Sequence, residues 1–90
     1  MRVVGNIDHP IYKITIFKMD TKFSLKFEID LLELTYKMRE GEIIQSVEDV
    51  KSIVTPIFLK GIDEQFRSMM KLRNQAMETK ATENDFPDII

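Results

Sequence analysis

The residue types that most often carry out chemistry in proteins are sparse in this sequence. The one histidine, His9, follows Asp8 and precedes Pro10. A histidine beside a carboxylate can act as a general base. Here the two residues are adjacent in a turn-like segment with no evident nucleophile, so we interpret His9 as a solvated turn residue. The chain contains no cysteine, which excludes disulfides, thiolate metal sites and cysteine nucleophiles.

Two pairs of adjacent carboxylates, Glu48-Asp49 and Asp63-Glu64, are the remaining candidates for acid–base or metal chemistry. Adjacent helix residues point about 100° apart, so neither pair forms a shared site by itself. One histidine cannot build the usual zinc sites, and the three glycines stand too far apart for a phosphate-binding loop. The sequence therefore predicts no catalytic residue, no metal and no cofactor. An enzyme with a site at an oligomer interface ranks third among the functions considered.

Basic residues recur between residues 13 and 39 and suggest a nucleic-acid surface. Proteins that bind single strands combine a basic groove with aromatic side chains on which bases stack. The candidates for such a face are Lys13, Phe17, Lys22, Lys26, Lys37 and Arg39. Glu28 and Glu33 share this face, Phe17 is its one aromatic residue, and the chain has a net charge of −2. We therefore favour a solvated sheet face and rank weak nucleic-acid binding second among the functions.

The alternation of apolar and polar residues predicts antiparallel strands between residues 11 and 39. Turns at Asp20-Thr21 and Asp30-Leu31 would place the apolar residues of neighbouring strands opposite each other on one face. The expected pairs are Ile16 with Leu25, Ile14 with Phe27, Tyr12 with Ile29, Phe27 with Leu34 and Leu25 with Tyr36. Residues 2–7 would add a short edge strand if they pair as well.

Two helices follow the strands in the predicted fold. Ser46 is a good N-cap, and Glu48 and Asp49 place negative charge in the first turn of a short helix. Thr55 and Pro56 end this helix and begin a second one, predicted to run to about residue 80. The fold class is therefore α+β. It consists of a three-stranded antiparallel β-meander, or a four-stranded one with residues 2–7, followed by two α-helices packed on its apolar face. We expect one domain over residues 1–80 and a flexible acidic tail over residues 81–90.

The second helix has a wider apolar surface than packing on a sheet requires. A helix of about 25 residues spans about 37 Å, whereas strands of eight or nine residues span less than about 30 Å. Its distal half should therefore project past the sheet with apolar residues still on it. Met70 and Met77 are two turns apart and share a face, as in helix–helix contacts. The predicted contact surface consists of Phe66, Met69, Met70, Arg73 and Met77.

These features favour a small non-catalytic interaction module that self-associates or docks a protein partner through its long C-terminal helix. Two-fold dimers are the commonest oligomers, so we expect a homodimer with Met70 and Met77 near its seam and Phe66 at the edge of the monomer core. A hetero-complex is the alternative that the sequence leaves open. No apolar run reaches the ~18 residues of a membrane span, and no signal-peptide core is present, so we expect a cytoplasmic protein without membrane contact.

Overall fold

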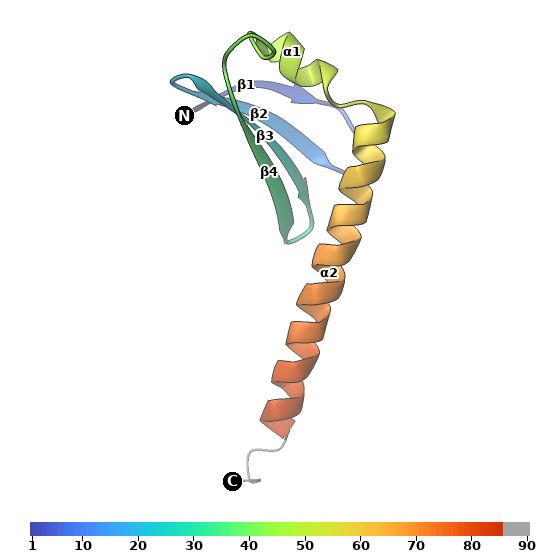
Figure 1. The fold of residues 1–90 in the computed structure, drawn as a ribbon. Helices are drawn as coiled ribbons and strands as arrows, with labels where there is room; N and C mark the ends of the chain where they lie inside the picture. Colours follow the sequence, from blue (N-terminus) through green and yellow to red (C-terminus); the bar gives the residue numbers. More distant parts are fainter. Residues whose placement is uncertain (86–90) are drawn as a thin grey trace.

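The fold is a four-stranded antiparallel sheet followed by a short helix and a long one (Figure 1). It was obtained as a computed structural model that describes residues 1–85. The strands are β1 (Arg2–Ile7), β2 (Lys13–Met19), β3 (Lys22–Ile29) and β4 (Leu32–Arg39), in the order β1-β2-β3-β4. The predicted α+β meander is therefore confirmed, and residues 2–7 form its fourth strand.

The register of the central strands is the one that the hydrophobic alternation predicts. Ile16 lies opposite Leu25, and Phe27 lies opposite both Ile14 and Leu34. Two-residue loops connect the strands, and the first residue of each loop has a positive φ, which is 54° at Asp20 and 56° at Asp30. Aspartate visits this left-handed region more readily than most residues because its short side chain can form local hydrogen bonds. Both turns therefore form without glycine.

The outer edge of β1 is irregular. The pairing of β1 with β2 shifts between Val3 and Gly5, which is the signature of a β-bulge. The short helix α1 (Val47–Ser52) packs against this strand so closely that a Cβ added at Gly5 would lie 3.0 Å from Val47 Cγ1. Glycine at this position thus permits the approach of α1 to the sheet.

Local capping fixes the start of each helix. Ser46 and Asp49 form a reciprocal capping box at the N-terminus of α1. The Thr55 hydroxyl accepts a hydrogen bond from the backbone N–H of Phe58 at 3.2 Å, at the start of α2 (Pro56–Asp85). The sequence between residue 80 and Asp85 contains no glycine or proline, and α2 continues past its predicted end. Residues 86–90, the rest of the expected tail, lie outside the described residues.

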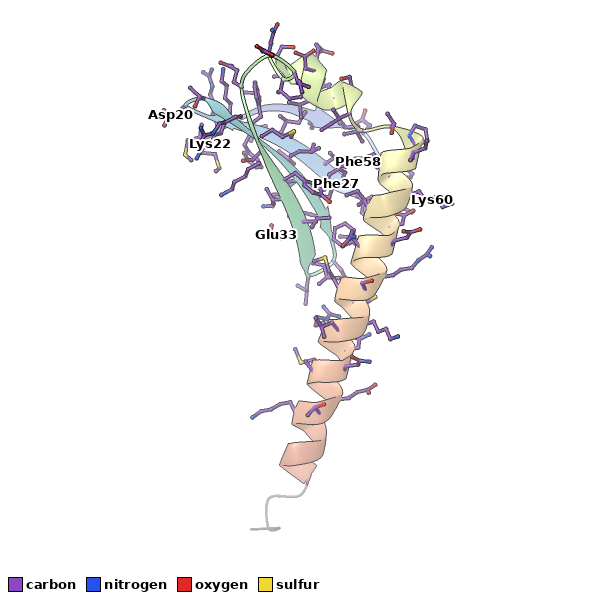
Figure 2. All side chains as sticks on the ribbon, in the orientation of Figure 1. Asp20, Lys22, Phe27, Glu33, Phe58 and Lys60 are labelled. Atoms are coloured by element: carbon purple, nitrogen blue, oxygen red, sulfur yellow. The ribbon has the colours of Figure 1, made fainter. Side chains whose placement is uncertain are left out.

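The hydrophobic core lies between the apolar face of the sheet, α1 and the first turns of α2. Phe27 and Phe58 point toward each other in this layer (Figure 2), with ring centroids 5.9 Å apart. Lys22 and Glu33 lie on the opposite side of the sheet in the same view. The buried apolar residues are Tyr12, Ile14, Ile16, Phe23, Leu25, Phe27, Ile44, Val50, Ile62 and Phe66.

Replacing Phe27 with alanine tests the assignment of the sheet faces. Phe27 is 0% exposed, and its removal should lower the free energy of unfolding by about 3–5 kcal/mol because it leaves a cavity in the core. The measurement is a urea titration followed by circular dichroism. Leu31→Ala is the control, since Leu31 is 87% exposed and should change stability little. A loss below about 1 kcal/mol for Phe27→Ala would contradict the assignment.

Candidate functional site

The distal half of α2 projects beyond the rest of the molecule. The chain measures 59 × 28 × 20 Å along its principal axes, and α2 accounts for the long dimension. Figure 1 shows the orange and red part of α2 extending past the end of the sheet without a neighbouring element. This geometry agrees with the projection expected from the relative lengths of the helix and the strands.

The proximal half of α2 is anchored to the sheet by aromatic packing. Phe66 is 4% exposed and stacks on Tyr12, with ring centroids 5.1 Å apart. Ile62 is buried on the same side of the helix, and Phe58 packs between Phe27 and Tyr36. Phe66 was included in the predicted contact surface. Its side chain is buried in the monomer core, which agrees with its expected place at the core's edge and leaves it outside the exposed surface.

The stripe of α2 that contacts the sheet continues into the projecting half. Spacings of three and four residues link Phe66, Met69, Arg73 and Met77 on one side of the helix. Met69 packs against the core, Met70 and Arg73 are half-buried, and Met77 is 63% exposed. The surface formed by Met69, Met70, Arg73 and Met77 is called the distal face below. It becomes progressively more exposed toward the end of the helix.

A groove connects the distal face to the sheet. It has a volume of about 270 Å³ and runs between α2 and the adjoining ends of β2 and β3. Its lining includes Met70, Phe66, Ile11 and Ile29. Ile11 is 62% exposed and was not predicted as part of the contact surface. The sequence feature that could have indicated Ile11 is its position as an apolar residue just before the first alternating strand.

A hydrogen bond joins α2 to Tyr12, the residue directly before β2. The Tyr12 hydroxyl donates to the Asp63 carboxylate. Burial of the hydroxyl and, as a smaller effect, its contact with Asp63 raise the pKa of Tyr12 to about 12. His9 Nδ1 accepts hydrogen bonds from the backbone N–H groups of Ile11 and Tyr12, each at 3.1 Å, and its ring stacks on Tyr12. His9 was predicted to be a solvated turn residue. It is half-buried, because the turn folds its ring onto Tyr12.

The register of the sheet brings the predicted basic residues together on its polar face. Lys26, at the centre, lies 3.0 Å from Glu33 and 3.6 Å from Glu28, and its Nζ lies 5.9 Å from the centre of the Phe17 ring. The hydrogen bond to Glu33 raises the pKa of Lys26. The basic residues that share this face are Lys13, Lys22, Lys26, Lys37 and Arg39. The central cation is thus matched by carboxylates of the same sheet.

Within residues 1–85 no three histidine, aspartate or glutamate side chains gather as a metal site. No helix in this part of the chain is long and apolar enough to cross a membrane. In comparisons with known proteins, the chain matches no family model, no curated protein and no solved structure. Its function must therefore be argued from its own surfaces.

Replacing Tyr12 with phenylalanine tests the link between β2 and α2. The folded-state pKa of Tyr12, about 12, exceeds the ordinary value of 10.0, so its contribution to stability is full below pH 10 and decreases as the pH rises toward 12. Between pH 9 and about pH 11, the free energy of unfolding of the wild-type chain should fall by about 1 kcal/mol more than that of Tyr12→Phe. Urea titrations at both pH values measure the difference. An equal decrease in the free energy of unfolding of the two proteins would contradict a stabilising hydrogen bond between Tyr12 and Asp63.

Proposed function

We propose that this protein is a non-catalytic interaction module that docks a helical segment of another chain on the distal face of α2. The observation that carries the proposal is the continuity between the core-packing stripe and this face. Met77 continues the stripe of Phe66 and Met69 but is 63% exposed, with no element of residues 1–85 beside it. A monomer rarely keeps such an apolar surface without a use.

The free-standing part of the helix supports the same proposal. Residues 71–85 project past the sheet, and most helical stability in proteins comes from tertiary packing of one helix face rather than from helix propensity. A partner packed on this segment would supply tertiary contacts that stabilise it. Fully burying one methionine side chain contributes about 1.5–3 kcal/mol. Flexible methionine side chains also adapt well to a contacting surface.

The occupant that requires the fewest assumptions is a second copy of the chain. In a two-fold contact the same patch serves both subunits, and two-fold dimers are the commonest assemblies. An antiparallel pair of α2 helices would bring Met70 of one copy close to Met77 of the other. Arg73 lies between them and can keep its charged end in water while its stem covers apolar surface.

Charged substitutions on the distal face test self-association through α2. Met70→Glu combined with Met77→Glu should reduce the mass measured by light scattering after size exclusion to half the wild-type value, because carboxylates would be buried in the contact. Circular dichroism should still show a folded chain with both strand and helix, because the sheet and the anchored half of α2 do not depend on the contact.

The matched control places two carboxylates on the opposite side of α2. Lys71→Glu combined with Gln75→Glu introduces them at exposed positions and should leave the mass unchanged. Equal masses for the Met70/Met77 variant and the wild type would contradict self-association through the distal face. A monomeric wild type at high micromolar concentration would do so as well.

Weak nucleic-acid binding by the polar sheet face remains a second candidate, favoured by Lys13, Lys22, Lys37 and Arg39, which share this face with Phe17. Glu28 and Glu33 neutralise the central Lys26 of this face. The charge available to phosphates is therefore smaller than the number of basic residues suggests.

We expect binding to single-stranded DNA or RNA no tighter than the ~10⁻⁴–10⁻⁶ M of non-specific contacts at physiological salt. Fluorescence anisotropy with labelled oligonucleotides measures this affinity. Sub-micromolar binding that Lys26→Glu and Phe17→Ala abolish would reverse the order of the two candidate functions.

A further inference from the structure

The two edges of the sheet differ in how they are protected. The edge strand β1 carries a bulge in its pairing with β2, and α1 covers its apolar face at Gly5. The edge at β4 pairs without interruption over Leu32–Arg39 and contains no proline and no bulge. Within residues 1–85 no strand pairs with its outer side. Such an edge presents a row of backbone donors and acceptors on which another strand can add.

The pairing with β3 determines which backbone groups of β4 point outward. The two-residue loop makes Ile29 and Leu32 the pair that closes the hairpin, and hydrogen-bonded pairs then alternate along the strands. The Glu40 N–H donates to the Thr21 carbonyl at 2.7 Å, so this even-numbered residue, too, bonds toward the β3 side. Even-numbered residues of β4 therefore bond to β3. The outward groups belong to Glu33, Thr35 and Lys37.

These outward residues are complementary to themselves in an antiparallel arrangement centred on Thr35. Thr35 then lies opposite Thr35 of the second copy, and Glu33 lies opposite Lys37. On the apolar face Leu34 lies opposite Tyr36, and the same register places Leu32 opposite Met38. Opposite charges, paired threonines and apolar pairs all stabilise neighbouring strands.

The neighbouring registers lack this match. Centring the pair on Tyr36 would place Glu33 opposite Arg39, but it would leave Leu32 opposite Glu40, just past the end of β4, and Lys37 opposite Thr35. Centring it on Leu34 would place Leu31 opposite Lys37 and leave Glu33 without an opposing cation. Only the register centred on Thr35 therefore places a cation opposite Glu33 and an apolar side chain opposite Leu32.

We propose that β4 pairs antiparallel with β4 of a second copy of this chain in the register centred on Thr35. Lysines on an edge strand normally keep copies apart. Here Glu33 faces the partner strand's lysine, so the same charges select a second copy. Lys37 forms no ion pair with the side chains described in residues 1–81, and Tyr36 is 39% exposed, so both would gain a contact.

The contact joins the two sheets into one, with the apolar faces of both copies on the same side. It does not involve the distal face of α2. The groove beside Met70 adjoins β2 and β3, whereas the proposed pairing uses the outer edge of β4. The proposal therefore does not rest on the function proposed above, and each surface can be tested alone.

A disulfide across the two-fold axis tests the register. Cα atoms of a hydrogen-bonded antiparallel pair are about 5.5 Å apart, which suits a disulfide. The chain has no cysteine, so Thr35→Cys introduces a single thiol. Under mild oxidation it should run mainly as a disulfide-linked dimer on a non-reducing gel. Lys13→Cys, exposed on the same face but on β2, should stay monomeric. A monomeric Thr35→Cys, or equal cross-linking of both variants, would overturn the proposal.

Charge reversal tests the Glu33–Lys37 pairs. Glu33→Lys or Lys37→Glu alone places like charges opposite each other at two symmetric positions and should raise the dissociation constant of the dimer about tenfold. The two substitutions together should restore it. Glu33→Lys also removes the ion pair between Glu33 and Lys26 of the same chain, and the second substitution, Lys37→Glu, does not restore that ion pair. Recovery of the dimer in the double variant therefore reports the contact between copies.

Both tests use sedimentation or gel analysis of chains that also carry Met70→Glu and Met77→Glu. In that background an association through α2 is absent, so the two proposals fail independently. Single charge reversals that leave the dissociation constant unchanged, or a double variant that dissociates as readily as the single ones, would overturn pairing through β4.

Discussion

The aromatic contact between the sheet and the first turns of α2 determines where every other surface of the molecule lies. Phe27 is fully buried and packs near both Phe58 and Tyr12, with ring centroids 5.9 Å and 6.4 Å apart. Tyr12 in turn stacks on Phe66 and bonds to Asp63. Because these contacts involve only the proximal half of α2, the rest of the helix extends into solvent, and the candidate docking face follows from the packing of the core.

The parts of the fold that the sequence predicts are those governed by short-range rules. Period-2 alternation determined the faces and the register of β2 and β3, because a shift of one residue would expose the apolar set. Ser46 and Thr55 marked the helix starts, since each hydroxyl accepts a hydrogen bond from a backbone N–H in the first helical turn. The extension of α2 past the sheet followed from the rise per residue of helices and strands alone.

The features that escaped prediction depend on contacts between distant residues. The hydrogen bond between Tyr12 and Asp63 joins residues 51 positions apart, and no local pattern indicates it. Tyr12 also stacks on His9, and this contact makes the turn histidine half-buried. Glu28 lies opposite Glu33, and the repulsion between the two carboxylates is offset by Lys26, which contacts both.

The two-residue loops of the meander also affect how the chain folds. They connect β2 to β3 and β3 to β4 with little loss of loop entropy, so the sheet forms from contacts that are close in sequence. The docking of α2 onto Tyr12 closes a much longer loop. We therefore expect the three-stranded meander to form early and the docking of Asp63 and Phe66 to follow. Substitutions at Tyr12 then act mainly on the rate of unfolding, whereas those at Leu25 also slow folding.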